Sequence, residues 1–124
     1  MKRMIAYLAV LVMLLSACSG EPKPDDRYSE NTVTAMKAAI ETLDDFLSYN
    51  LTAEEASEKL DRIANTMDQS DLNARIAETS ISTASTLVGI CGRYADWGDS
   101  DKASEAMKDV KESRDSLYNS LYGK

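Results

Sequence analysis

Beyond residue 30, apolar residues recur at alternating steps of three and four, which is the spacing of one face of an α-helix. Polar turn segments break this pattern three times, so it predicts four amphipathic helices. They run from 31 to about 49, from Thr52 to about Met67, from the turn at 68–70 to Trp97, and from Asp99 or Ser100 to Gly123. Short connections between such helices are typical of an antiparallel four-helix bundle, so we predict a small all-α fold of two αα-hairpins.

Three of the predicted helices each present one apolar stripe to the core. The inward-facing residues are expected to be Val33, Met36, Ile40, Leu43 and Leu47 in the first helix, Ala56, Leu60, Ile63 and Met67 in the second, and Ala103, Met107, Val110, Leu117 and Leu121 in the fourth. Arg114 falls on the last of these lines, and we expect it at the margin of the core. Thr52 and Glu55 form a predicted capping box, and Gly123 suits a C-terminal cap.

The third predicted helix carries two apolar stripes side by side, so we expect it to be buried over a broad arc. One stripe is Ala77, Ile81, Ala84, Val88, Cys91 and Ala95, and the other is Ile76, Thr83, Leu87, Ile90 and Tyr94. The first stripe places Cys91 in the core. The remaining face carries Glu78, Ser82, Ser85, Gly89 and Arg93. The small and hydroxylated residues of this helix, with Gly89 and Gly92, either allow close helix packing or line a polar ligand groove.

The first 18 residues have the pattern of a bacterial export signal. Lys2 and Arg3 are followed by an apolar segment, Met4 to Leu15, which at twelve residues is too short to span a membrane. The next positions complete the lipobox pattern, which is matched by Leu15, Ser16, Ala17 and Cys18. In these residues the chain resembles the bacterial lipoproteins.

This resemblance implies that Cys18 receives a diacylglyceryl thioether and that the signal peptide, residues 1–17, is cleaved before it. Residues 18–30, with Pro22 and Pro24, are then expected to be a flexible tether, and residues 31–124 the helical domain. The lipid would hold the protein on the extracytoplasmic face of a bacterial cell membrane or outer membrane. Two other interpretations are an ordinary secretory signal with a chance cysteine and an N-terminal anchor that is not cut.

Charge and residue types narrow the classes of function. The net charge is −7, and removal of Lys2 and Arg3 would leave 12 basic residues against 21 acidic ones, so we expect no binding to nucleic acid. The chain has no histidine, no CxxC pair and no phosphate-binding loop, so we expect neither an enzyme nor a cofactor. Asp96, Asp99 and Asp101 lack the glutamate that completes a calcium loop, and we predict helix-capping acids rather than a metal site.

These observations favour a lipid-anchored surface protein that binds another protein. The turns at 49–52 and 96–100 should meet at the end of the bundle away from the tether. They carry a mixture typical of interface hot spots, namely Tyr49, Leu51, Trp97 and Asp99. In the alternative interpretation, Tyr49 and Trp97 plug the end of the core. The alternative function is the binding of a small ligand or solute, which would need a pocket. The oligomeric state is left open by the sequence.

The lipobox predicts that Cys18→Ala abolishes lipid attachment, because the thioether needs the cysteine sulfur. The variant should incorporate no fatty-acid label, and it should accumulate as an uncut precursor or be released from the membrane. Metabolic labelling followed by membrane fractionation measures both effects. Normal labelling of Cys18→Ala would contradict the lipoprotein assignment.

Overall fold

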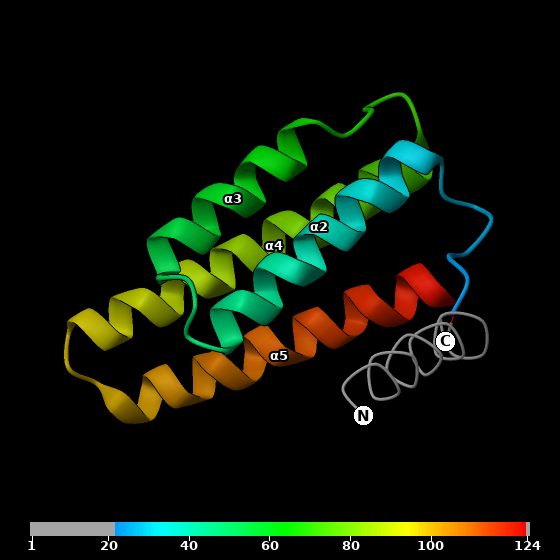
Figure 1. Ribbon diagram of the computed structural model, residues 1–124. Helices are drawn as coiled ribbons and strands as arrows, with labels where there is room; N and C mark the ends of the chain where they lie inside the picture. The colour runs from blue at the N-terminus through cyan, green and yellow to red at the C-terminus, as the bar shows by residue number, and fades with distance from the viewer. Residues whose placement is uncertain (1–21, 124) are drawn as a thin grey trace, which may run out of the picture.

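A computed structural model describes residues 22–123, which form four helices and contain no strand. The lipobox and the residues before it lie outside the described residues. Helices α2 (Glu30–Leu47) and α4 (Leu72–Asp96) lie diagonally, and each packs against both α3 (Ala53–Asn65) and α5 (Ser100–Tyr122) (Figure 1). Consecutive helices run in opposite directions, so the predicted antiparallel four-helix bundle is confirmed.

The helix ends follow the local sequence signals. The Glu55 backbone N–H donates to the Thr52 hydroxyl at 3.1 Å, and the Thr52 N–H donates to the Glu55 carboxylate at 3.3 Å, so the predicted capping box is confirmed. Asp99 caps α5, and Gly123 ends it in the left-handed conformation. Helix α2 stops two residues earlier than predicted, because Tyr49 has a positive φ.

The predicted stripes of α2, α3 and α5 form most of the core. The fully buried side chains on these helices include Met36, Leu43, Leu60, Val110 and Leu121. Others pack against the core while remaining partly exposed, namely Val33, Leu47, Ile63 and Met107. Helix α4 contributes Ala77, Ile81, Ala84, Val88 and Cys91.

The prediction of a second buried stripe on α4 is wrong. Ile76, Thr83 and Ile90 are exposed, and Leu87 and Tyr94 are only half-buried. Helix α4 has α3 on one flank and α5 on the other, so nothing in the described chain covers the side that faces away from α2. The broad buried arc therefore narrows to a single stripe.

Two residues near the first stripe of α4 also differ from prediction. Ala95 is exposed, because the α2–α3 hairpin ends before reaching it. Ser85 was expected on the polar face but is buried, because α3 packs over it. Its hydroxyl lies 2.9 Å from the Ser57 hydroxyl and 2.7 Å from the Asp61 carboxylate, so its hydrogen-bonding groups are satisfied.

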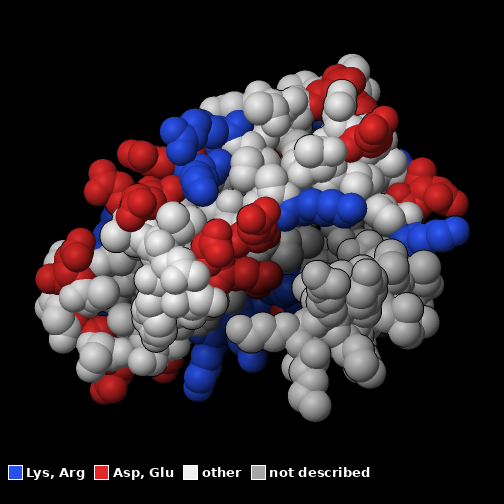
Figure 2. Space-filling model, viewed as in Figure 1, with Lys and Arg blue, Asp and Glu red and all other residues white. Residues whose placement is uncertain are grey.

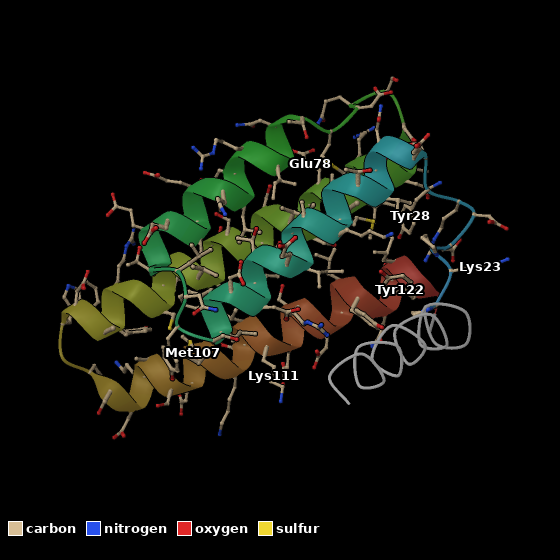
Figure 3. The ribbon with its side chains drawn as sticks, in the orientation of Figure 1. Lys23, Tyr28, Glu78, Met107, Lys111 and Tyr122 are labelled. Carbon is tan, nitrogen blue, oxygen red and sulfur yellow. The ribbon has the colours of Figure 1, made fainter. Side chains whose placement is uncertain are left out.

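Residues 25–28 pack against the C-terminal end of α5 (Figure 3). Tyr28 is buried, and its hydroxyl lies 2.6 Å from that of Ser120. The backbone N–H of Asp25 donates to the carbonyl oxygen of Leu121 at 2.6 Å. The predicted tether is thus wrong over these residues: the packed chain begins before residue 30. Periodicity could not detect this, because one aromatic ring makes no stripe.

Arg114 lies at the margin of the α5 stripe, as predicted. Its guanidinium donates to both carboxylate oxygens of Asp44 on α2, at 2.8 Å and 3.2 Å, and stacks over the Tyr118 ring. These hydrogen bonds to Asp44 raise the pKa of Arg114, which stays charged. Both partners are partly exposed, so the pair orients α2 against α5 more than it stabilises the fold.

Helices α3 and α4 approach each other closely where α3 begins. A Cβ added at Gly92 on α4 would lie 2.6 Å from the Cβ of Ala53, well inside van der Waals contact. At Gly89, one turn earlier, an added Cβ would meet nothing within 4 Å. The expected role in close packing is therefore confirmed for Gly92 and wrong for Gly89.

These two glycines form a matched pair for mutation. Gly92→Ala should lower the free energy of unfolding by about 1–3 kcal/mol, because the contact with Ala53 must open. Gly89→Ala should raise it by up to about 1 kcal/mol, because alanine is the better helix former and has space there. Urea unfolding of both variants measures the difference, and shifts of the same sign would contradict the packing described.

Candidate functional site

The two hairpins differ in length, and the difference opens a groove at one end of the bundle. Helices α4 and α5 have 25 and 23 residues, against 18 and 13 in α2 and α3. The α4–α5 hairpin therefore extends past the turn that joins α2 to α3 (Figure 1). Between this overhang and the turn lies a groove of about 560 Å³, which we call the end groove.

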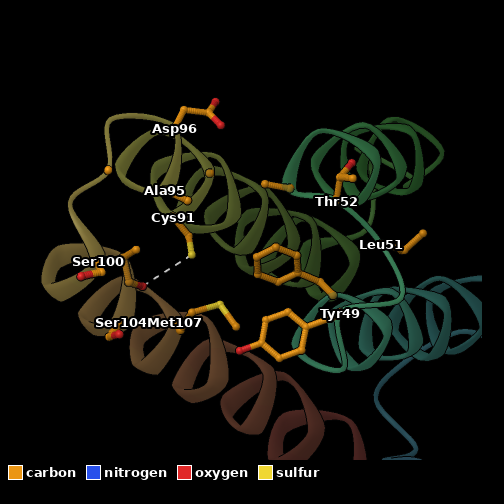
Figure 4. A pocket seen from close by; sticks show the side chains of 14 residues that line it. Tyr49, Leu51, Thr52, Cys91, Ala95, Asp96, Ser100, Ser104 and Met107 are labelled. Carbon is orange, nitrogen blue, oxygen red and sulfur yellow. Dashed lines mark hydrogen bonds between the residues drawn. The ribbon is translucent and has the colours of Figure 1, made fainter.

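The lining of the end groove is mostly apolar. It consists of Phe46, Tyr49, Leu51, Thr52, Ala53, Cys91, Gly92, Ala95, Asp96, Gly98, Ser100, Ala103, Ser104 and Met107. Asp96 is the only charged residue among them. Small side chains on α4 and α5 leave the space open, and Tyr49 and Met107 point toward each other across it (Figure 4).

Cys91 lies at the inner end of this groove and is buried, as predicted. Its thiol donates a hydrogen bond to the carbonyl oxygen of Ala103, with a sulfur–oxygen distance of 3.6 Å (Figure 4). Burial raises the pKa of the Cys91 thiol, so the thiolate is disfavoured at neutral pH. The Cys91 side chain, in its protonated form, is therefore an apolar part of the groove wall.

Tyr49 has an unusual backbone conformation for a large residue. Its φ is 64°, the only positive value at a non-glycine position within residues 22–123. It follows the C-cap of α2, where glycine is favoured because a side chain in the left-handed region costs about 1–2 kcal/mol. The Tyr49 side chain is 85% exposed, so it does not recover this cost by filling the core.

The interpretation of Tyr49 and Trp97 as plugs of the core is wrong. Trp97 is 73% exposed, and its ring packs edge-on against Tyr94 with the centroids 5.9 Å apart. Trp97 does not line the end groove, whereas Leu51 does, and Asp99 is engaged in capping α5. Of the four predicted contact residues, the structure brings together Tyr49 and Leu51.

Asp99, at this end of the bundle, serves local structure. Asp99 accepts the Lys102 backbone N–H at 3.1 Å, as expected of a capping residue. Within residues 22–123, no three or more acidic or cysteine side chains are placed to hold a metal ion together.

The sequence predicted the two turns that meet here but not the groove between them. The groove depends on how two hairpins of different length are positioned along the bundle axis. Helix periodicity does not predict that relative position. The available signal was the run of small residues at the end of the longest predicted helix, Gly92 and Ala95, opposite Ala103 and Ser104.

Comparisons of the chain with protein-family models, with curated proteins and with solved structures found no significant match.

Trp97 is the sole tryptophan of the chain, so its fluorescence reports on this end of the bundle. We expect the emission of a water-exposed indole, readily quenched by acrylamide. Trp97→Ala should change the free energy of unfolding by no more than about 0.5 kcal/mol, as for other exposed side chains. A blue-shifted, quencher-protected emission or a large loss of stability would show that the indole is buried after all.

Proposed function

We propose that this protein is a lipid-anchored module on the extracytoplasmic face of a bacterial membrane, and that it binds a partner protein through the end groove. The anchor is argued from residues 1–18 and their resemblance to the lipoprotein signal. None of the described helices is long and apolar enough to cross a membrane. Attachment through lipid on Cys18 is the mode that the sequence supports.

The position of the groove suits such an anchor. Residues 25–28 pack beside the C-terminus of α5, so the chain that leads back to Cys18 leaves from that end of the bundle. The end groove lies at the opposite end, beyond the α2–α3 turn (Figure 1). A protein held at the first end would present the groove away from the membrane surface.

Tyr49 carries the case for a protein partner. Its side chain is exposed at the groove and stands where the backbone would be more stable with glycine. Large aromatic side chains supply much of the binding energy in protein interfaces. Strain retained without a folding benefit is typical of functional positions. A binding role explains both the conformation and the exposure of Tyr49.

The surroundings of the groove indicate the chemistry of the partner. Acidic side chains stand around this end of the molecule (Figure 2), and Glu54 lines a neighbouring hollow together with Asp96 and the basic Arg93. A segment that places an apolar side chain in the groove and basic residues beside it would match both the lining and the charge.

A second candidate is the binding of a small apolar ligand. The groove volume of about 560 Å³ lies within the range of small-molecule sites, and its lining is mostly apolar. This function would make little use of the solvent-facing side of the Tyr49 ring, which is why we rank it second.

Substitutions at Tyr49 separate binding from folding. Tyr49→Gly should leave the free energy of unfolding unchanged or raise it by up to about 1 kcal/mol, because relief of the left-handed strain outweighs the added chain entropy. It should nevertheless abolish capture of the partner. The matched control, Tyr49→Phe, keeps the ring and should retain capture.

Capture is measured with a photoreactive amino acid at Leu51 of the full-length chain in intact cells, with Lys59 on the outside of α3 as the control position. The proposal requires a protein adduct at Leu51, none at Lys59, and loss of the adduct in Tyr49→Gly but not in Tyr49→Phe. An adduct that survives Tyr49→Gly would contradict the role of Tyr49. Binding of an apolar fluorescent dye to the purified chain, without any protein adduct, would favour the small-ligand candidate.

A further inference from the structure

The exposed apolar side chains of this protein are concentrated on one helix. Within residues 22–123, the exposed large apolar residues are Tyr49, Leu72, Ile76, Ile90 and Trp97. All except Tyr49 lie on α4 or at its C-cap. Ile76 is 53% exposed and Ile90 37% exposed, although isoleucine is usually buried in a protein core. The other helices leave no comparable row uncovered.

The exposed isoleucines of α4 belong to a straight line of residues along the side of the helix that faces away from α2. Ile76, Thr83 and Ile90 are spaced by seven residues, and Leu72, Thr79 and Thr86 fill the intervening positions at the same spacing. All six are exposed, and we call them the outer face of α4. This is the heptad pattern of helices that pair along their length.

The residue types on the outer face do not suit an exposed surface of a single chain. Five of the six are β-branched, which lowers helix propensity at positions where solvent-facing helices favour Ala, Glu or Lys. Their threonine hydroxyls already donate to carbonyls one turn earlier, as Thr83 does to Thr79 at 2.8 Å and Thr86 to Ser82 at 3.1 Å. If another surface covered this face, the threonine hydroxyls would still have their hydrogen-bond partners.

Charge selects the occupant of this face. The chain as a whole is acidic, with a net charge of −7, yet residues 79–92 contain no charged side chain. Asp109 and Glu112 of α5 border the groove that runs beside Thr79, Thr83 and Leu87. Two copies of an acidic protein repel each other over most of their surfaces. The six residues of the outer face carry no charge, so two copies that meet there have their carboxylates at the margins of the contact rather than at its centre.

We infer that the outer face of α4 binds the outer face of α4 in a second copy of this chain, with the two helices parallel. Ile76, Thr83 and Ile90 share one heptad position, at which β-branched residues favour two strands in parallel coiled coils. Parallel pairing places both N-terminal segments, which dock beside the C-terminus of α5, at the same end of the dimer. It also places both end grooves together at the other end, so the dimer presents two binding sites.

The contact is small, and this sets its strength. From Ile76 to Ile90 the helix rises about 21 Å. A contact of that length falls short of the roughly 800 Å² per partner of a typical stable interface, so pairing should be weak in dilute solution. Confinement of both copies to one membrane would raise their effective concentration and favour the pair. This last step rests on the proposed lipid anchor; the outer face itself does not.

Disulfide cross-linking in membranes from cells that express the full-length chain tests the pairing. In a parallel dimer Ile76 faces Ile76 and Ile90 faces Ile90, so Ile76→Cys and Ile90→Cys should each give a dimer of twice the chain mass on mild oxidation. Lys59→Cys, exposed on the far side of α3, should not. The unsubstituted chain shows the background from its own cysteines and should not cross-link through the buried Cys91.

A second pair of variants keeps the cysteine at one position and changes another residue of the outer face. In the Ile90→Cys chain, Thr83→Glu sets two carboxylates against each other and should slow cross-linking at least about tenfold, the effect of roughly 1.4 kcal/mol. Thr83→Val should preserve or speed it. Neither change should lower the melting temperature of the monomer appreciably, because Thr83 is exposed.

Three results would overturn the inference. The first is cross-linking of Ile76→Cys that is no faster than that of Lys59→Cys, and the second is a product of any mass other than twice the chain. The third is a dimer formed only between Ile76→Cys and Ile90→Cys chains, because that product requires antiparallel pairing. Tyr49→Gly should leave the cross-linking unchanged. Loss of partner capture and loss of pairing can therefore be told apart.

Discussion

Both proposed surfaces depend on how α3 packs against α4, where Gly92 lies in close contact with Ala53. That contact lies at the point along α4 where α3 begins, and the length of α4 beyond this point has no helix from the first hairpin beside it. That uncovered length is one wall of the end groove. Helix α3 packs on one flank of α4 and α5 on the other, which leaves the outer face of α4 without a neighbour among the described residues.

The interior of the bundle shows no defect that would explain the exposure of the end groove or of the outer face of α4. Within the described residues, no buried side-chain nitrogen or oxygen lacks a hydrogen-bond partner, and the core residues of all four helices pack into one cluster. The conflicts with local preference lie on the outside: a tyrosine in a conformation that suits glycine, and threonine and isoleucine where a solvated helix favours alanine or glutamate. Natural sequences break such rules mainly at functional positions, where stability is exchanged for binding.

Helix periodicity predicted the features that are determined within a single helix. The four helices, the capping box at Thr52, the cap at Asp99 and the burial of Cys91 all follow from local spacing and residue chemistry. What depends on the relative placement of helices could not be predicted. The second stripe of α4 has the composition of a core face, and only the arrangement of α3 and α5 shows that none of the described helices covers it. The docking of Tyr28 and the end groove are likewise properties of the assembled bundle.

The two proposed surfaces support each other through the direction of the helices. In a parallel pair the end grooves lie side by side at the end opposite the N-terminal segments, and two weak sites held together bind a partner with two matching segments far more tightly than either alone. An antiparallel pair would separate the grooves by the length of α4, about 37 Å, and would send the two N-terminal segments in opposite directions. For chains anchored in one membrane, as proposed, the parallel arrangement is the one in which dimerisation would strengthen binding of a partner at the groove.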